Sequence, residues 1–289
     1  MFKKLALLLA LTAATAIGAA TAHATNLRTW VSGAGTDIDN FTCSRAAPCQ
    51  TFANAVGETT PGGEINCLDP GDFGGVTISN AITIDCEGAS NGGIQAAAGT
   101  TGITINATGR VNLIGLEIDG ENAGGGYGVN ITSNAVVNIR NCKIFGFATG
   151  LGTGIYFSPT SSGGILVVDN VFLSNNYYGI YQVSTTGSSN MTVRNSNIND
   201  NTSGISVIVA GGTHAGATIE QTTLAFNGNI GLETQGAGAV AIIGGSTVVN
   251  NNAGVFINGG IVYSAKNNQI YGNNVDGTPL TAYPGGPLN

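Results

Sequence analysis

Charged side chains are scarce in this sequence. Asp, Glu, Lys and Arg make up 9% of its 289 residues, and sixteen acidic residues face nine basic ones, for a net charge of -7. An average globular domain carries about 25% charged residues. Nucleic acids and anionic bilayers are bound through basic surfaces, so this shortage excludes both as partners held by charge.

Ligands for transition metals are scarce as well. Of the two histidines, His214 lies in a Gly-rich segment and His23 lies near the N-terminus, and the sequence contains no CxxC pair. Zinc and copper sites need several such ligands close together. We therefore predict that the protein binds neither zinc nor copper and has no cofactor. Calcium, which takes oxygen ligands, is the one metal that we keep as an alternative.

Long apolar runs are absent except at the N-terminus. Lys3 and Lys4 precede an apolar run from Leu5 to Ala20, and Ala22-His23-Ala24 follows it as a small-x-small pattern. These features are typical of a signal peptide over residues 1–24, cleaved near Ala24. We predict no membrane span, and a product that is secreted, periplasmic or bound at the cell surface.

Glycine is abundant and recurs at a nearly constant spacing. A Gly followed by an apolar residue returns about every 25 residues, a period that is typical of solenoids. These glycines are Gly75, Gly102, Gly128, Gly154, Gly179, Gly204, Gly231 and Gly254.

Each repeat contains three short segments in which apolar residues alternate with other residues. Val129 and Ile131 alternate in the first segment, Val137 and Ile139 in the second, and Ile144 marks the third. A period of two indicates β-strands with one face buried. We predict an all-β, single-stranded parallel β-helix of about eight coils, each of about 25 residues. The predicted boundaries are 25–63 for an N-terminal strand and cap helix, 64–274 for the β-helix and 275–289 for a C-terminal tail.

Asparagines and cysteines recur at defined places in the repeats. Asn tolerates the left-handed conformation of turns, and its amide can bond the neighbouring coils, so the column after the third strand predicts an asparagine ladder. That column contains Asn176, Asn201, Asn227 and Asn251. For the five cysteines, export permits disulfides, and we expect Cys43–Cys49 first and Cys67–Cys86 next. The remaining thiol, Cys142, is predicted to be buried.

From Arg28 to Asn274 the chain resembles the right-handed parallel β-helix proteins of pectate-lyase-like fold, including the NosD-like repeats. The resemblance implies a right-handed coil, which parallel crossovers also favour. It further implies that a helix, here from Pro48 to about Glu58, plugs the N-terminal end of the cylinder with Phe52 and Val56.

The same resemblance brings in polysaccharide lyases and glycoside hydrolases. The motifs of the polygalacturonases, an Asn-Thr-Asp segment, an Asp-Asp pair, a Gly-His-Gly and an Arg-Ile-Lys, are all missing here. Lyases need carboxylates on neighbouring coils to hold calcium. Glu117, Asp119 and Glu121 are the candidates for that metal, and a solvated acidic turn is the default interpretation.

Two columns of outward-facing residues are candidate binding surfaces, and the first consists of charged residues. Arg140, Asp169, Arg194 and Glu220 fall at one position of successive coils and alternate in sign. Such a column sets the register of the coils by pairing opposite charges, or it forms a charged groove for a glycan.

Tyrosines provide the second outward column. Tyr156 and Tyr181 follow each other on adjacent coils, with Tyr178, Asp200 and Glu233 nearby. The rings predict either an aromatic surface for a sugar or simple cross-strand stacking. Glu233 and Asp200 are the candidate catalytic carboxylates if the protein is an enzyme.

Three functions follow. The first is an exported, non-catalytic interaction module that binds a glycan. The second is a polysaccharide lyase or glycoside hydrolase with an atypical site. The third is an adhesive or structural surface protein, because little besides prolines blunts the C-terminal edge.

Overall fold

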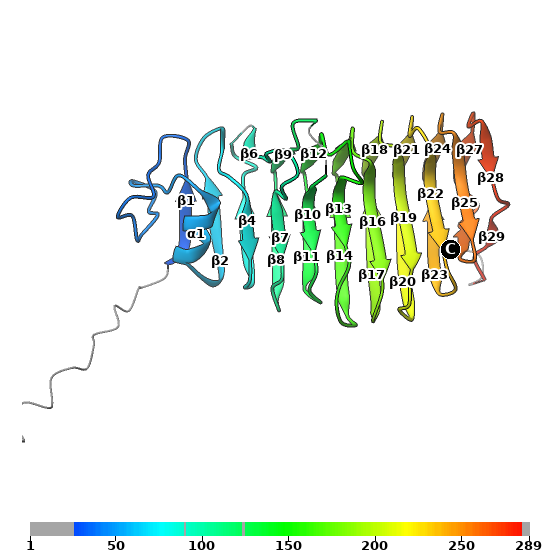
Figure 1. The fold of residues 1–289 in the computed structure, drawn as a ribbon, viewed down its shortest axis with the longest axis horizontal. Coiled ribbons are helices and arrows are strands. Elements are labelled where there is room, and N and C mark those ends of the chain that lie inside the picture. Colours follow the sequence, from blue (N-terminus) through cyan, green and yellow to red (C-terminus); the bar gives the residue numbers. More distant parts are fainter. Residues whose placement is uncertain (1–25, 90, 123–124, 285–289) are drawn as a thin grey trace, which may run out of the picture.

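The computed structural model describes residues 26–89, 91–122 and 125–284, so the predicted signal peptide lies outside the described residues. The strands stack coil upon coil along a rod, as Figure 1 shows. The all-β parallel solenoid of about eight turns is confirmed. No described helix is long and apolar enough to cross a membrane.

Three parallel sheets form the rod, and each coil runs through sheet I, then sheet II, then sheet III. Sheet I contains β4 (Val76–Ile78), β7 (Ile103–Ile105), β10 (Tyr127–Ile131), β13 (Thr153–Phe157), β16 (Tyr178–Ser184), β19 (Ser203–Val209), β22 (Ile230–Gln235), β25 (Ala253–Asn258) and β28 (Val275–Gly277). Sheet II contains β1 (Asn26–Val31), β2 (Thr59–Cys67), β5 (Ile82–Asp85), β8 (Arg110–Ile114), β11 (Val136–Arg140), β14 (Gly164–Asp169), β17 (Ser188–Arg194), β20 (His214–Glu220), β23 (Ala239–Gly244), β26 (Ile261–Ser264) and β29 (Thr281–Ala282). Sheet III contains β3 (Gly71–Asp72), β6 (Gly92–Gln95), β9 (Glu117–Asp119), β12 (Lys143–Phe145), β15 (Phe172–Ser174), β18 (Asn197–Asn199), β21 (Thr223–Ala225), β24 (Thr247–Val249) and β27 (Gln269–Tyr271). Residues 275–282, within the predicted tail, thus carry the outermost strands of sheets I and II, β28 and β29.

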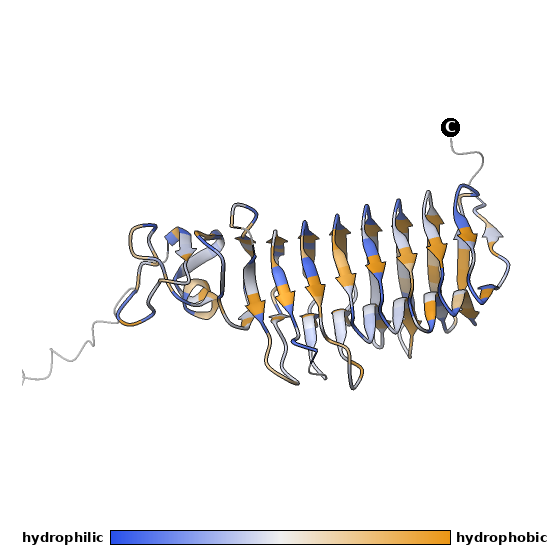
Figure 2. Ribbon diagram, turned by 90° about the horizontal axis from the view of Figure 1, so that it is seen from above, coloured by the Kyte–Doolittle hydropathy of each residue, from blue (hydrophilic) through white to orange (hydrophobic). Residues whose placement is uncertain are grey.

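The apolar side chains fill the interior in columns. Ile103, Val129 and Ile155 pair across neighbouring coils and are fully buried, as the alternation predicts. Figure 2 shows the apolar segments repeating from strand to strand. At the C-terminal end the column weakens, because Ile257 and Ile270 are only partly buried.

One interior column contains polar residues that the apolar pattern does not reveal. Gln182 follows Phe157 and precedes Val207 in the same register, and it is fully buried. Its Nε2 donates to the carbonyl and the hydroxyl of Ser189, at 3.2 and 3.0 Å, and to the carbonyl of Gly216. These bonds tie sheet I to sheet II across the core.

The helix α1 (Phe52–Glu58) begins later than the predicted start at Pro48. The Asp37 carboxylate accepts hydrogen bonds from the backbone N–H groups of Gln50 and Thr51 and holds them in an extended path. Thr51 then caps the helix by accepting from the backbone of Asn54.

The helix lies at the N-terminal end of the rod, beside β1 and β2 (Figure 1). Its buried residues are Phe52 and Ala55, whereas Val56 is only partly buried. The Phe52 ring packs edge to face on Phe73, with centroids 5.1 Å apart.

Both expected disulfides form. Cys43–Cys49 closes the loop before α1, and Cys67–Cys86 joins β2 to the end of β5 on the next coil. Cys142 is the free cysteine of the described residues, and burial raises the pKa of its thiol to about 12. The thiol is therefore protonated and unreactive at neutral pH.

Buried asparagines join successive coils at the turn after sheet III. Asn176 Nδ2 donates to Asn201 Oδ1, Asn201 to Asn227, and Asn227 to Asn251, at 2.8 to 3.2 Å. Each Oδ1 also accepts the backbone N–H of the preceding asparagine in the series, as Asn201 does from Asn176 at 3.0 Å. Every side chain thus satisfies backbone groups that the turn would leave unpaired.

Replacing Asn201 with Ala should lower the free energy of unfolding by about 2–4 kcal/mol, because several buried polar groups lose their partners. Denaturant unfolding of the two proteins measures the difference. Asn197→Ala, at an exposed position of the same coil, is the control and should stay within about 0.5 kcal/mol of the parent. Equal effects of the two substitutions would contradict the role of the buried side chain.

The charge column of sheet II has the predicted register. Arg140 pairs with Asp169, Asp169 with Arg194, and Arg194 with Glu220 on consecutive strands. Within this column, all of it described by the structure, only Arg194 and Asp169 come within ion-pair distance, at 2.9 Å. A hydrogen bond from Asn195, together with the Arg194 guanidinium, holds the pKa of Asp169 below its ordinary value.

Asp169→Arg should destabilise the protein by about 1 kcal/mol, because it places three cations in a row and removes the ion pair. The loss should be larger at low ionic strength, since salt screens exposed charges. Thermal unfolding at two salt concentrations measures it, with Asp169→Asn as the isosteric control. A midpoint that does not change at low salt would show that the column has no influence on stability.

Candidate functional site

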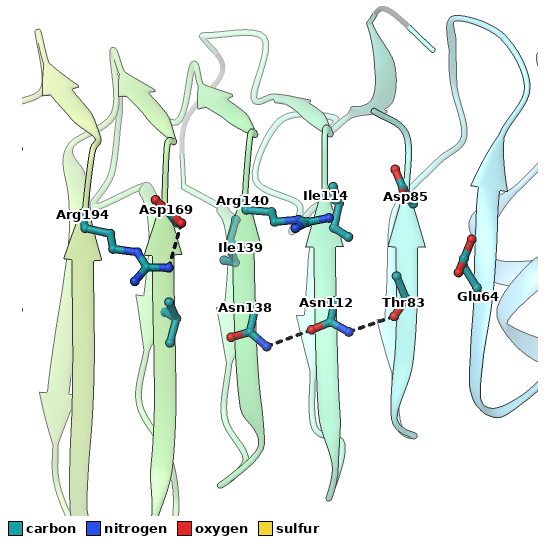
Figure 3. A pocket seen from close by; sticks show the side chains of 11 residues that line it. Glu64, Thr83, Asp85, Asn112, Ile114, Asn138, Ile139, Arg140, Asp169 and Arg194 are labelled. Carbon is teal, nitrogen blue, oxygen red and sulfur yellow. Dashed lines mark hydrogen bonds and ion pairs between the residues drawn. The ribbon is translucent and has the colours of Figure 1, made fainter. Parts of the chain in front are cut away.

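A polar groove of about 480 Å³ lies on the outward face of sheet II. It is built from two rows of side chains, because successive outward positions of a strand lie two residues apart. The first row contains Asp85, Ile114, Arg140, Asp169 and Arg194, and the second contains Thr83, Asn112, Asn138 and Val167. Glu64 closes the N-terminal end, as seen in Figure 3.

The second row is held in one orientation by hydrogen bonds. Asn138 Nδ2 donates to Asn112 Oδ1 at 2.8 Å, and Asn112 Nδ2 donates to Thr83 Oγ1 at 2.9 Å. Figure 3 shows the three side chains as a continuous chain along the groove. The direction of these hydrogen bonds fixes which side-chain atoms present donors to the groove and which present acceptors.

The first row contains charges of both signs. Asp169 is paired with Arg194, and Glu64 is paired with Arg28 at 3.2 Å. Arg140 takes part in none of the ion pairs among the described residues. Its side chain extends over Ile114 towards Asp85 (Figure 3). Its guanidinium therefore presents donors to the groove that make no ion pair or hydrogen bond with the described side chains.

Sequence reasoning identified only part of this groove. The column from Arg140 to Arg194 was recognised from its alternating charges, but the row of Thr83, Asn112 and Asn138 was missed. The signal was present, because these three polar residues occupy one outward position on consecutive coils. Pattern alone did not show that the two rows and Glu64 line one groove.

The tyrosines form a stacked row on the outward face of sheet I. Tyr156 and Tyr181 pair in register, with ring centroids 5.8 Å apart and planes inclined by 16°. Tyr127, which the sequence did not single out, stacks on Tyr156 at 4.7 Å, and Tyr178 lies 4.6 Å from Tyr181. Because stacked neighbours cover each other's faces, the row presents ring edges and hydroxyls between its ends.

Burial changes the acidity of this row. It raises the pKa of Tyr178 to about 12, helped by Tyr181, Tyr177 and Glu233, and it also raises the pKa of Tyr181. Their hydroxyls are protonated at neutral pH. Glu233 accepts a hydrogen bond from Ser206 Oγ at 2.9 Å.

The two candidate catalytic carboxylates lie in different parts of the coil. Glu233 belongs to β22, while Asp200 is an exposed residue in the turn after β18, with a φ of 57°. No hydrogen bond joins their side chains in the part of the chain that the structure describes.

The structure does not bring the calcium candidates together. Glu117 is paired with Lys143 of the next coil at 3.2 Å, and Asp119 accepts the backbone N–H of Glu121 at 2.7 Å. Glu121 lies beyond that turn, with a φ of 55°. No group of three or more His, Cys, Asp or Glu residues that could hold a metal occurs within the described ranges. Lys143 and the turn thus engage the carboxylates of Glu117 and Asp119, and calcium binding at these three residues stays an untested alternative to the solvated acidic turn.

Comparison with known proteins gives one match. Residues 78–283 match a family model whose description is periplasmic copper-binding protein (NosD). No curated protein and no solved structure matches the chain. A periplasmic family agrees with the export predicted from the sequence.

The described side chains do not fit a copper ion. Copper prefers thiolate, thioether and imidazole ligands. Four of the five cysteines are in disulfides, and Cys142 and Met191 are each only 2% exposed. That leaves His214, at the start of β20, as the one accessible ligand of these three types among the described residues.

The match does establish the family to which the fold belongs. It covers more than two thirds of the sequence, and it spans all but the first strands of the parallel solenoid. The chain belongs to the NosD family.

Proposed function

We propose that this chain is an exported binding module that holds a neutral glycan in the groove of sheet II without cleaving it. The observation that carries the proposal is Arg140, whose guanidinium faces the groove beside an ordered row of side-chain amides and has no ion-pair partner among the described residues. Five donors beside amides and carboxylates match a ligand rich in hydroxyls.

The layout of the groove favours an extended polymer. Neighbouring coils lie about 4.8 Å apart, so a chain lying along the rod meets a new pair of polar side chains at each coil. Glu64, Asp85 and Asp169 oppose Arg140 and Arg194, so the groove carries no excess of positive charge. A polyanion would therefore gain little there, whereas hydroxyl groups can both donate and accept.

The charges also favour binding over hydrolysis. A general acid needs a carboxyl group whose pKa is raised towards neutrality. In Asp169 the pKa is lowered by Asn195 and Arg194, so this carboxyl is ionised at neutral pH and has no proton to donate. Glu64 is engaged by Arg28.

The row of Tyr156, Tyr178 and Tyr181, with Glu233, is a second proposed contact surface. Its hydroxyls would donate to a sugar, and the outer ring faces at its ends would pack on C–H groups. It lies on sheet I, so a glycan in the groove of sheet II does not reach it.

Arg140→Ala should weaken glycan binding about 10- to 100-fold, because a hydrogen bond to a charged group contributes about 1.5–3 kcal/mol. Calorimetric titration with the best ligand from an array of neutral oligosaccharides measures the change. Arg110→Ala is the matched control, since it removes an exposed arginine of the same sheet outside the groove. An affinity that survives in Arg140→Ala would remove the groove as the binding site.

The double variant Tyr156→Ala with Tyr181→Ala should lose about 1–3 kcal/mol of stability, because each stacked pair contributes about 0.5–1.5 kcal/mol. Its affinity for the glycan in the groove should not change. If the tyrosine row is itself a glycan surface, the number of ligands bound per chain falls in the same titration. An unchanged number would leave the row as cross-strand stacking.

A further inference from the structure

One turn position of the solenoid takes the left-handed conformation in coil after coil. It is the residue that directly follows the sheet III strand, and its φ lies between 52° and 84°. The residues at this position are Gly146, Asn175, Asp200, Phe226, Asn250 and Gly272. Glycine, asparagine and aspartate adopt this conformation most easily, and an aromatic residue does not.

Phe226 is the exception, and it is unfavourable in two ways. Its φ is 57°, where a bulky side chain crowds the backbone. Its side chain is also 58% exposed, so the ring gains little from burial. Within the described residues the ring packs against no other aromatic ring. Backbone strain of this kind persists mainly where a side chain serves a ligand.

A hollow of about 410 Å³ opens beside this ring. Its walls include the side-chain amides of Asn250, Asn252 and Asn274, and Asn274 Nδ2 donates to Asn252 Oδ1 at 3.0 Å. The buried Asn227 and Asn251 form its floor, and Asn227 Nδ2 donates to Asn251 Oδ1. No charged residue lines it.

Gly228, at the edge of the hollow, is a second independent observation. Its φ is not positive, and a Cβ built there would meet nothing within 4 Å. Neither the backbone conformation nor a steric clash requires glycine at this place. A side chain would instead reach into open space beside Phe226, so glycine keeps the hollow accessible.

We propose that this hollow binds a neutral saccharide unit, whose C–H face packs on the Phe226 ring while its hydroxyls pair with the amides of Asn250, Asn252 and Asn274. An aromatic face with amides is the combination that suits a sugar ring. The lining offers no opposite charge to a phosphate or carboxylate group, so a neutral ligand fits it better. The proposal shares only its ligand class with the proposed function, because the turns after β21, β24 and β27 lie away from the groove of sheet II (Figure 1).

The test uses Phe226→Asn in the full chain. Asn adopts the left-handed conformation readily, so removal of the backbone strain should raise the thermal midpoint by about 2–4 °C. The probes are maltohexaose, cellohexaose, xylohexaose and mannohexaose, followed through the NMR signals of the side-chain amides. In the parent at least one probe should shift the signals of Asn250, Asn252 and Asn274, and in Phe226→Asn the shifts should disappear.

Three further variants make the result specific. Phe172→Asn removes a ring that is 41% exposed in β15, at a position without a left-handed backbone, and should keep the shifts without a rise in midpoint. Gly228→Leu fills the hollow and should abolish the shifts. Arg140→Ala should keep them, which separates this site from the groove. The proposal is overturned if no probe shifts these amides in the parent, or if Phe226→Asn or Gly228→Leu responds as the parent does.

Discussion

Parallel pairing in a constant register is the interaction on which the rest of this molecule depends. It places each side chain about 4.8 Å from its equivalents on the neighbouring coils, so residues act as columns and not singly. Ile103, Val129 and Ile155 make a continuous apolar core in this way, Asn176 and Asn201 pass hydrogen bonds from turn to turn, and Tyr156 and Tyr181 stack. The same geometry turns single polar residues into extended surfaces, and the three proposed contact surfaces are products of that repetition.

The sequence predicts which residues stack on neighbouring coils well, and it predicts where the surface forms a groove poorly. Alternation identified the buried faces of the strands, and the spacing of cysteines identified both disulfides, because these depend on periodicity and chain distance alone. The buried Gln182 was missed because its partners, Ser189 and Gly216, are recognisable only after the coils are stacked. The late start of α1 depends on Asp37, which acts across a loop. The groove depends on the lengths and directions of side chains, which a pattern of residue types does not contain.

For this protein, membership of the family says little about which ligand the surface binds. The NosD match follows the repeat, and the repeat is made of interior columns and turn residues. Outward positions are free to change without disturbing that pattern, so the match carries little information about ligands. Among the described residues His214 is the one accessible side chain of the types that copper prefers, so the copper-binding description of the family finds little support in the surface chemistry of this chain.

The two ends of the rod are unlike, and this gives the molecule a direction. At the N-terminal end, α1 and two disulfides fix the first coils, whereas at the C-terminal end Ile257 and Ile270 are only partly buried and β27, β28 and β29 are the outermost strands of the three sheets. In a solenoid each coil is stabilised mainly by its neighbours. We therefore expect thermal opening to start at the C-terminal coil, which contains Gly272 and Asn274, and to proceed inward. A ligand that contacts both Phe226 and Asn274 would stabilise the C-terminal coil against opening. Occupancy of the hollow should therefore increase the protection of that coil from hydrogen exchange.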